Sequence, residues 1–495
     1  MNYRSTRSTN ASGVSSATAI KNGLAPDGGL YMPERIPQFS EDDFKSLIDK
    51  TYAQRAAFVM GAFLSDYTQE ELLSDAEISY SEQRFPGGAA PIHNIDGNVY
   101  SLELWHGPTC AFKDMALQIM PRLLSRALTK TGEERTAMIL VATSGDTGKA
   151  ALEGYKDVDK IKIKVFYPVN GVSRVQKLQM ATQEGSNVDV YAIHGNFDDA
   201  QNGVKRIFSD TEFKNELDSE GIFLSSANSI NWGRLVPQVV YYISAYCDMV
   251  KNKEIKFGEQ IDVCVPTGNF GNIFAAYIAK LAGLPICKLI CASNKNNILT
   301  DFLESGTYDR NREFYTTISP SMDILISSNL ERLLYLVCGS EKTAYYMNEL
   351  SKNGKYSLAT DEFAKIKENF VGYYSDESAT KNTIKETYEN NGYLIDTHTA
   401  VGYNAAKQYI FENGNERKIV LASTASPFKF ACDVYEALNG KKAEDELLAL
   451  ELLSKQTNCD IPTPIRNIGE RKVRFSAVCD AQDMKKTVME FAKNK

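Results

Sequence analysis

The sequence HGPTCAFKDMALQ, at residues 106–118, contains one lysine shortly after a Gly-Pro turn. An ordinary surface lysine has polar neighbours, whereas Lys113 follows Ala111-Phe112 and begins an apolar helical pattern made of Met115, Ala116, Ile119, Met120, Leu123 and Leu124. Burial beside apolar groups disfavours an ammonium and lowers the pKa of the lysine, which is what a Schiff-base amine needs. The alternative is an exposed Lys113–Asp114 pair at the start of a helix, and other parts of the chain decide between the two.

The length and composition describe a folded protein with more than one domain. At 495 residues the chain is too long for one ordinary core. Its 43% apolar and 24% charged residues are typical of a folded chain. The 55 basic and 63 acidic side chains give a net charge of -8, so the composition offers no electrostatic support for a nucleic-acid partner.

The termini and the cysteines indicate a reducing compartment. Residues 1–7 contain no apolar signal core, and no apolar run reaches the length of about 18 residues that a membrane helix needs. The nine cysteines are widely spaced without a Cys-X-X-Cys pair, as expected of buried thiols. We therefore expect a cytoplasmic protein without a membrane segment, a disulfide framework or a metal site.

Apolar runs alternate with helical patterns over most of the chain. Each expected strand is a continuous apolar run, as in a parallel sheet whose two faces are both covered by helices. These runs lie at residues 138–142, 161–167, 188–193, 261–265, 286–291 and 419–421. The pattern predicts an α/β fold with parallel sheets.

The chain is expected to divide into an N-terminal domain, a main region and a C-terminal extension. The Phe-Pro-Gly-Gly sequence at 85–88 breaks the helical pattern of the N-terminal part. A charged, Tyr-rich and mostly helical segment interrupts the later strand pattern like an insertion. The predicted parts are an N-terminal domain at 1–95, a main region at 96–440 and an extension at 441–495. Within the main region we expect a smaller α/β subdomain at about 115–235, a larger one at about 96–114 and 236–440, and the helical insertion at about 296–393.

A glycine-rich loop, PTGNFGN at residues 266–272, lies between an expected strand and an expected helix. We call it the glycine loop. Its two glycines permit close approach of the backbone, and its polar side chains stand at a helix N-terminus, where a phosphate binds well. It lacks the lysine of a Walker loop. The alternative is an ordinary strand-to-helix turn capped by asparagine.

A second loop, TSGDTG at residues 143–148, has the same position between strand and helix. It is not a P-loop, because Thr143 stands where glycine is required and Ala150 where serine or threonine is required. Its hydroxyl and amide groups suit a carboxylate, although they could equally serve only to cap the helix.

A third loop, ASTASP at residues 422–427, follows the last expected strand. Its hydroxyls could donate to the edge of a ligand, or the Ser-Pro pair could simply start a helix.

A lysine among apolar neighbours, a phosphate-binding loop and a βαβ sheet together describe a pyridoxal-phosphate site. Here the sequence resembles the threonine synthase family, in its long form, from about residue 3 to 440. The motifs that carry the resemblance are ELWHGPT (103–109) and AFKD (111–114) for cofactor attachment, YRSTR (3–7) and GLAPDGGLY (23–31) for an N-terminal domain, and NSINWGR (228–234) and DTHTAVG (396–402) as further signatures.

The resemblance implies a fold-type-II pyridoxal-phosphate enzyme, with two parallel-sheet α/β domains, a small N-terminal domain and a helical insertion. It would be a carbon–oxygen lyase that converts O-phospho-L-homoserine and water into L-threonine and phosphate, the last step of threonine biosynthesis. Lys113 would then hold pyridoxal 5'-phosphate as a Schiff base, and Thr424 would hydrogen-bond the pyridine nitrogen. The cofactor phosphate would bind to Gly268, Asn269, Phe270, Gly271 and Asn272.

A threonine synthase also needs a site for the phosphate and carboxylate of its substrate, separate from the one that holds the cofactor phosphate. Its candidates are Ser144, Asp146 and Thr147 in the second loop, and Asn228, Asn231 and Arg234 near the start of a helix. Arg234 is the preferred partner of the substrate phosphate, because a guanidinium can hold two of its oxygens. Lys149 and Arg174 also lie at helix starts and compete for this role.

Several alternatives stay open. With four histidines in the chain, His398 is expected to start a helix or to support another side chain, and neither a metal site nor a catalytic triad is expected. Another lyase of the same fold, a phospholyase or a hydroxyamino-acid dehydratase, could share Lys113 and the glycine loop. A non-catalytic binding protein could use residues 296–393 as its interaction surface. The enzyme is expected to be a monomer or a homodimer with a small-molecule substrate.

Overall fold

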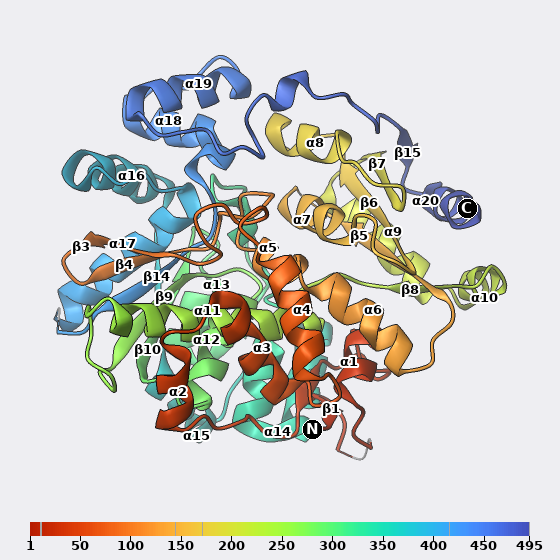
Figure 1. Ribbon diagram of the computed structural model, residues 1–495, viewed down its shortest axis with the longest axis horizontal. Helices are drawn as coiled ribbons and strands as arrows, with labels where there is room; N and C mark the ends of the chain where they lie inside the picture. Colours follow the sequence, from red (N-terminus) through yellow and green to blue (C-terminus); the bar gives the residue numbers. More distant parts are fainter. Residues whose placement is uncertain (10–11, 144, 171, 415, 495) are drawn as a thin grey trace.

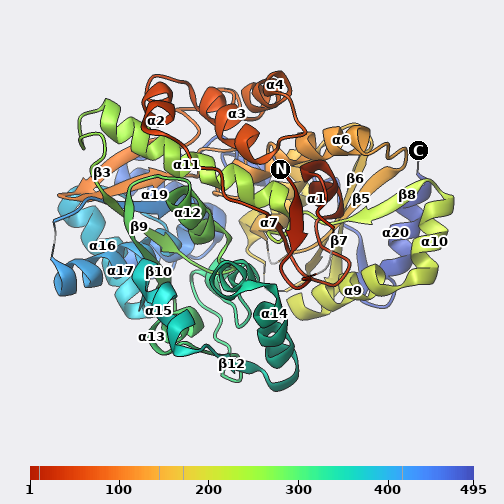
Figure 2. The same ribbon diagram turned by 90° about the horizontal axis from the view of Figure 1, so that it is seen from below.

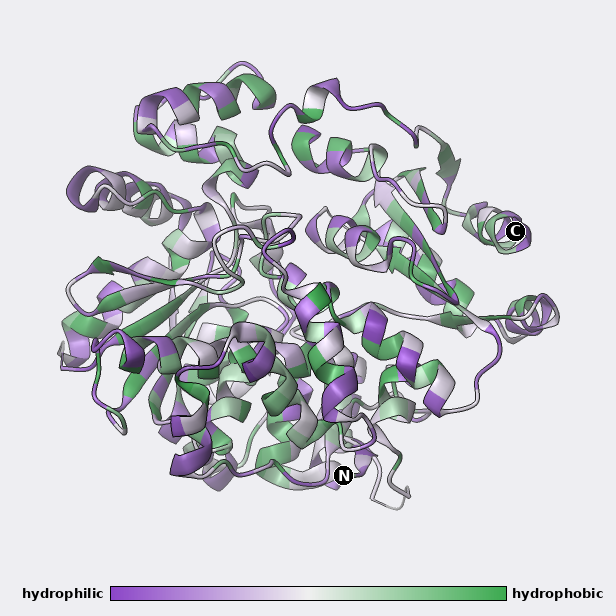
Figure 3. Ribbon diagram, in the orientation of Figure 1, coloured by the Kyte–Doolittle hydropathy of each residue, from purple (hydrophilic) through white to green (hydrophobic). Residues whose placement is uncertain are grey.

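Two parallel sheets with helices on both sides form the frame of the protein (Figure 1). The structure is a computed structural model that describes every residue except 10, 11, 144, 171, 415 and 495. The strands are mainly hydrophobic, whereas outer helices such as α16 (Glu377–Asn391) mix hydrophobic and hydrophilic residues (Figure 3). This is the pattern that the sequence predicts for covered parallel sheets.

The larger sheet has its strands in the order β13, β10, β9, β14, β4 and β3. All neighbours are parallel except β3, which is antiparallel to β4. Side chains of β9 alternate between two cores, since Val263 and Val265 pack with α11 and α12 while Cys264 packs with α17. The bounds are Phe370–Tyr374, Ile286–Ser293, Ile261–Pro266, Ile419–Ser423, Val99–Glu103 and Ile92–Asp96 for the strands, and Trp232–Lys251, Gly271–Leu281 and Thr397–Asn413 for α11, α12 and α17.

The smaller sheet has its strands in the order β15, β7, β6, β5 and β8, all parallel. Helix α7 packs on one face, and α9, α10 and α20 pack on the other. The bounds are Val478–Asp480, Val188–His194, Ile161–Pro168, Thr136–Ala142 and Ile222–Ser225 for the strands, and Asp146–Tyr155, Phe197–Ser209, Thr211–Ser219 and Met484–Lys493 for the helices. The short helix α8 (Arg174–Ala181) joins β6 to β7.

The N-terminal part consists of a two-stranded sheet, β1 (Tyr3–Ser5) and β2 (Tyr31–Pro33), and four helices. Capping boxes begin three of the helices, because Ser40, Thr51 and Thr68 each exchange hydrogen bonds with the residue three positions on. Helices α2 and α3 pack against α11, and α4 packs against α3 (Figure 2). The four helices α1 to α4 span Ser16–Asn22, Glu41–Leu47, Tyr52–Phe63 and Gln69–Ser79.

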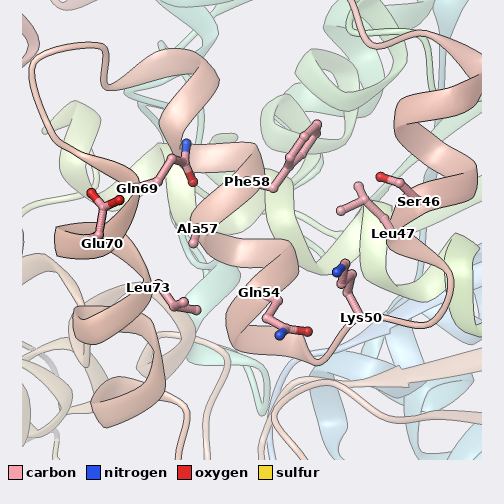
Figure 4. A pocket seen from close by; sticks show the side chains of 9 residues that line it. All are labelled: Ser46, Leu47, Lys50, Gln54, Ala57, Phe58, Gln69, Glu70 and Leu73. Atoms are coloured by element: carbon pink, nitrogen blue, oxygen red, sulfur yellow. The ribbon is translucent and has the colours of Figure 1, made fainter.

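A hollow of about 290 Å³ opens between α2, α3 and α4 (Figure 4). Its charged lining residues are Lys50 and Glu70, and both are exposed. None of its lining residues belongs to the three loops that the sequence indicates as binding sites. The hollow is therefore a surface feature of the N-terminal part and lies outside the candidate site.

Elements near three of the predicted domain boundaries belong to the two sheets. The segment 296–393 contains the helices α13 (Ile298–Ser305), α14 (Leu330–Asn353), α15 (Thr360–Asn369) and α16, but also β13, which forms an edge of the larger sheet. Strand β3 begins before residue 95 and already belongs to that sheet. The extension supplies β15 and α20 to the smaller sheet. These short edge strands have too few residues to show a clear period in the sequence.

Among the described residues, no helix has both the length and the apolar character needed to cross a membrane.

Other elements connect the sheets and the N-terminal part. The remaining helices and strands are α5 (Asp114–Leu117), α6 (Met120–Lys130), β11 (Thr307–Asp309), η1 (Pro320–Met322), β12 (Lys355–Ser357), η2 (Pro427–Phe430), α18 (Ala431–Asn439), α19 (Glu446–Thr457) and η3 (Ile468–Glu470).

Candidate active site

The parallel strands β4, β14 and β9 lie side by side, so the segments after their carboxyl ends meet at one edge of the larger sheet. The segment after β4 carries Lys113 and pairs with the segment after β14. Phe112 N–H donates to the Thr424 carbonyl at 2.8 Å, and Ala111 forms an antiparallel bridge with Ala425. These backbone contacts join the segment that carries Lys113 to the third loop, residues 422–427.

Lys113 lies inside the protein, as the sequence predicts. Its side chain is 11% exposed, and its Nζ atom lies 3.1 Å from Ser321 Oγ and 3.3 Å from Asp146 Oδ2. Burial lowers the pKa of the lysine, and Lys429 and Arg234 add to this effect while Asp146 opposes it. Asp114 does not pair with Lys113, because its carboxylate accepts from Thr109 N–H and Oγ1, each at 2.8 Å. The alternative of an exposed Lys113–Asp114 pair is excluded.

Asp146, at the start of α7, lies between two lysines. Its Oδ1 atom faces Lys429 Nζ at 3.1 Å and accepts from Gln176 Nε2 at 2.8 Å, while Oδ2 faces Lys113 and Ser321. Burial alone would raise the pKa of Asp146, but the ammonium groups of Lys429 and Lys113 hold it well below its usual range. A carboxylate in this position attracts cations, so its side chain does not fit the predicted role as a ligand for a substrate carboxylate.

Lys429 is a site residue that the sequence analysis missed. It lies in η2 with a side chain that is 0% exposed, and its Nζ donates to the Thr109 carbonyl at 2.7 Å as well as facing Asp146. A signal was present, since Lys429 stands between Phe428 and Phe430 just as Lys113 follows an aromatic residue. Only the fold brings the two lysines to the same carboxylate.

Ser321 and His398 were also not assigned to the site. Ser321, in η1, places its hydroxyl 3.2 Å from Asp146 Oδ2, and its backbone N–H donates to His398 Nε2 at 3.2 Å. Since Nε2 accepts, the proton of a neutral His398 ring stands on Nδ1, which lies 3.0 Å from Asp396 Oδ1. His398 therefore supports the segment that holds Ser321 against Lys113.

The glycine loop precedes α12 as predicted. Gly268 and Gly271 do not have positive φ angles, and the residue in the left-handed region is Phe270, with φ 61°. Space instead excludes a side chain at Gly268 and leaves little room for one at Gly271. A Cβ atom on Gly268 would lie 2.5 Å from the Ser321 carbonyl oxygen, and one on Gly271 would lie 3.3 Å from Asn329 Nδ2.

Asn272 presents an unsatisfied donor. Its Oδ1 atom accepts from the hydroxyls of Tyr241 and Tyr242, each at 2.5 Å, whereas its buried Nδ2 has no partner among the described residues. A buried donor without an acceptor is costly in a folded protein. The amide therefore suits a ligand with an oxygen acceptor at the N-terminus of α12, such as a phosphate.

The other residues of the glycine loop and the third loop support the site in different ways. Asn269 accepts through its carbonyl from both the backbone and the side chain of Asn329, at 3.0 and 2.9 Å. Thr424 is 5% exposed and lies directly after β14, where its backbone binds the lysine stretch.

Arg234 is the candidate cation without a carboxylate partner among the described residues. Its guanidinium is buried, donates from Nη1 to the Ala227 carbonyl at 2.9 Å, and leaves Nε without a partner. Burial lowers the pKa of Arg234 to about 10. Both rivals are paired, because Lys149 contacts Glu153 at 3.1 Å and the exposed Arg174 pairs with Asp445. A buried and unpaired cation is an unfavourable arrangement that an anionic ligand would relieve.

The remaining substrate candidates differ in their exposure and in their hydrogen-bond partners. Asn231 caps α11 by accepting from Gly233 N–H and donates to the Ile20 carbonyl, each at 2.9 Å, so both ends of its amide are engaged within the protein. Asn228 is exposed and Thr147 is half-buried in the first turn of α7. Ser144 lies outside the described residues.

Three family models match consecutive parts of the chain. They are described as the threonine synthase N terminus, at residues 2–80, the pyridoxal-phosphate dependent enzyme, at residues 87–424, and the threonine synthase C-terminal region, at residues 399–488. Together they extend over both sheets and over the predicted extension.

Known proteins are similar over most of the chain. Threonine synthase-like 1 of Homo sapiens is 41% identical over 439 residues, which cover 86% of this chain and 58% of that protein. The chain thus spans less than two thirds of the length of this relative. Threonine synthase of Pseudomonas aeruginosa is 37% identical over 468 residues, which cover 93% of this chain and 95% of the relative. The crystal structure of pyridoxal-phosphate-bound threonine synthase from Brucella melitensis has a TM-score of 0.88 and 36% identity, with 100% of both chains covered.

Proposed function

Because the chain belongs to the threonine synthase family of pyridoxal-phosphate-dependent enzymes, we propose that it converts O-phospho-L-homoserine and water into L-threonine and phosphate. The observation that carries the proposal is the buried amine of Lys113, whose partner Ser321 also lies against Gly268 of the glycine loop, within a chain that the family models match at residues 2–80, 87–424 and 399–488. Arg234, which is buried and has no carboxylate partner in the part of the chain that the structure describes, supports an anionic substrate.

The residues of the site fit pyridoxal 5'-phosphate. Asn272 Nδ2 is a buried donor without a partner, and it stands at the helix N-terminus that the phosphate would occupy. The absence of side chains at Gly268 and Gly271 leaves the backbone of the glycine loop open to close approach. Lys113 has the lowered pKa that an attaching amine requires. Phosphate binding is proposed for Gly268, Asn269, Phe270, Gly271 and Asn272.

The bound cofactor would supply an aldehyde that condenses with amines and a ring that accepts the electron pair left when a proton leaves a neighbouring carbon. The protein would supply the proton carriers. With substrate bound, Lys113 Nζ would remove the Cα proton and later return protons. Asp146 and Ser321, at 3.3 and 3.1 Å from Nζ, would orient the amine during these transfers. Thr424, buried at the end of β14, would donate its hydroxyl to the ring nitrogen.

We assign the substrate phosphate to Arg234. Its guanidinium has an unused Nε–H, and burial strengthens a charge-assisted bond to phosphate oxygens. The backbone N–H groups at the start of α7, near Thr147, would hold the substrate carboxylate, while the Asp146 side chain stays with Lys113. The exposed Asn228 is kept as a peripheral candidate.

The test is incubation of the purified protein with O-phospho-L-homoserine, with phosphate release and the amino-acid product followed together. Equal amounts of L-threonine and phosphate are expected. Formation of 2-oxobutanoate and ammonia instead would identify a phospholyase, and turnover of unphosphorylated hydroxyamino acids would identify a dehydratase. A protein that purifies without near-visible absorbance and stays colourless with added pyridoxal phosphate would favour a binding role.

The oligomeric state and the compartment stay predictions of the sequence. We expect a monomer or a homodimer by light scattering. We expect cytoplasmic fractions to contain the protein, as its nine free cysteines favour a reducing compartment.

A further inference from the structure

A second buried lysine contacts the site. The Lys429 side chain is 0% exposed, and its Nζ atom has two acceptors, the Thr109 carbonyl at 2.7 Å and Asp146 Oδ1 at 3.1 Å. An unpaired ammonium at this depth would be strongly disfavoured, so the contact with Asp146 is needed for its burial. Lys429 and Asp146 therefore form a buried ion pair one side chain away from the proposed cofactor lysine.

The two oxygens of Asp146 have separate partners. Oδ1 is held by Lys429 and by Gln176, and Oδ2 is left to face Lys113 and Ser321. Both lysines thus share one carboxylate. The orientation of the Oδ2 atom toward Lys113 is set by what binds Oδ1, because the carboxylate is planar and its Cγ lies between the two oxygens.

The polar groups around Lys113 come from four elements. Asp146 lies on α7, Lys429 on η2 and Arg234 on α11, and His398 on α17 accepts through Nε2 from the backbone N–H of Ser321. Two cations and one carboxylate therefore act on the Lys113 amine. If Lys429 were absent, Asp146 would have Lys113 as its remaining cationic contact, and the ammonium form of Lys113 would be favoured.

We propose that Lys429 is a positioning residue that fixes the Asp146 carboxylate and shares its charge, so that Lys113 Nζ can lose its proton while Asp146 stays paired. This role rests on the proposed function, in which Lys113 attaches the cofactor and then transfers protons. Lys429 binds Asp146 and not Lys113, so it orients Lys113 through the shared carboxylate, and its positive charge also disfavours the ammonium form of Lys113.

The test is a pH titration of the near-visible absorbance of the cofactor-bound protein, which reports the proton at Lys113 Nζ. Lys429→Met is expected to raise the titration midpoint by about 1 pH unit or more, the scale of a nearby charge. Lys429→Arg keeps the cation and should titrate near the wild type, with kcat closer to wild type than that of Lys429→Met. Lys442→Met is the control, because Lys442 is an exposed lysine outside the site.

A Lys429→Met protein that is folded, binds the cofactor and titrates like the wild type would overturn the proposal. If that variant does not fold, Asp146→Asn provides the second measurement. Lys113 would then face Lys429 and Arg234 without a carboxylate, so the midpoint should fall, and an unchanged midpoint would also overturn the proposal. The absorbance does not depend on which product forms, so a failure here is distinct from a failure to make threonine.

Discussion

At the scale of single residues, the site depends on cations that are buried for different reasons. Lys113 lies against the Phe112 ring, with Nζ 5.1 Å from the ring centroid, and burial lowers the pKa of the lysine. Arg234 cannot give up its proton near neutral pH and has no carboxylate partner among the described residues. The first is suited to covalent attachment and proton transfer, and the second to binding an anion.

Lys113→Ala should abolish turnover and leave the fold intact. The variant removes the amine that is proposed to attach the cofactor and to move the Cα proton. Circular dichroism and the melting temperature should stay close to those of the wild type. Borohydride reduction of the wild type, followed by peptide mapping, should place the cofactor on the peptide with Lys113. A different labelled lysine would refute this assignment.

Arg234→Leu should lower kcat/KM for O-phospho-L-homoserine by about 2 kcal/mol or more, close to 30-fold, because charged hydrogen bonds contribute on that scale. Binding of an analogue without the phosphate, followed by cofactor absorbance, should change little. Arg174→Leu is the matched control, since Arg174 is exposed and paired with Asp445. Equal losses for phosphorylated and unphosphorylated ligands would show that Arg234 supports the fold instead.

At the scale of elements, the glycine loop is held from two sides. Ser327 Oγ donates to the Gly268 carbonyl at 2.7 Å, and Asn329 binds the carbonyl of Asn269. On the other side, Tyr241 and Tyr242 of α11 hold Asn272. The loop geometry thus depends on two elements that are distant from it in sequence.

Gly268→Val should weaken cofactor binding far more than it lowers the melting temperature. A side chain there meets the Ser321 carbonyl at 2.5 Å, whereas one at Gly271 meets the side-chain amide of Asn329 at 3.3 Å. Gly271→Val should therefore have the smaller effect, and Gly271→Ala the smallest. The dissociation constant for pyridoxal phosphate, measured by absorbance titration, gives the comparison. Normal affinity in both valine variants would mean that the loop is only a turn.

Tyr242→Phe should weaken pyridoxal-phosphate binding several-fold, because a net hydrogen bond contributes about 1 kcal/mol. The change leaves Asn272 with one of its two tyrosine donors, so its amide is less firmly oriented. Tyr246→Phe is the control on the same helix, since that hydroxyl contacts the Glu259 carbonyl and the Gly258 N–H. A larger effect at Tyr246 than at Tyr242 would contradict the role of Asn272.

At the scale of the whole molecule, the N-terminal part is joined to the site through α14. Arg7 binds Glu331 at 2.8 and 2.7 Å, and Glu331 lies in the first turn of α14 beside Asn329, which holds the glycine loop. Arg332 extends this contact, because it donates to the Tyr31 carbonyl and to Asn329. The N-terminal segment therefore supports the glycine loop through Glu331, Asn329 and Arg332.

Arg7→Leu should lower the melting temperature and weaken cofactor binding together. It leaves the Glu331 side chain, which is 5% exposed, without its arginine. Because Arg7 itself is 32% exposed, the expected cost is about 1–3 kcal/mol, as for a buried polar group that loses its partner. Arg4→Leu is the matched control, because the Arg4–Glu34 pair is 49% and 32% exposed and such pairs contribute little. A similar effect of the two substitutions would argue against coupling through α14.

The sequence by itself was enough to predict the parallel strands, the buried Lys113 and the glycine loop. These features are local, since a strand with both faces covered is a continuous apolar run and a buried lysine such as Lys113 has apolar neighbours in the sequence. The short edge strands β13 and β15 were missed because pairing with a distant strand, and not their own pattern, makes them strands.

Only the tertiary structure decided which charged groups meet. Lys429 and Ser321 are 316 and 208 residues from Lys113, yet both converge with it on Asp146. Likewise, Lys149 and Arg174 compete with the preferred Arg234 in the sequence, and the fold pairs these two with carboxylates and leaves Arg234 without a carboxylate partner among the described residues. Charge interactions depend on distance and burial, and neither is encoded by spacing along the chain.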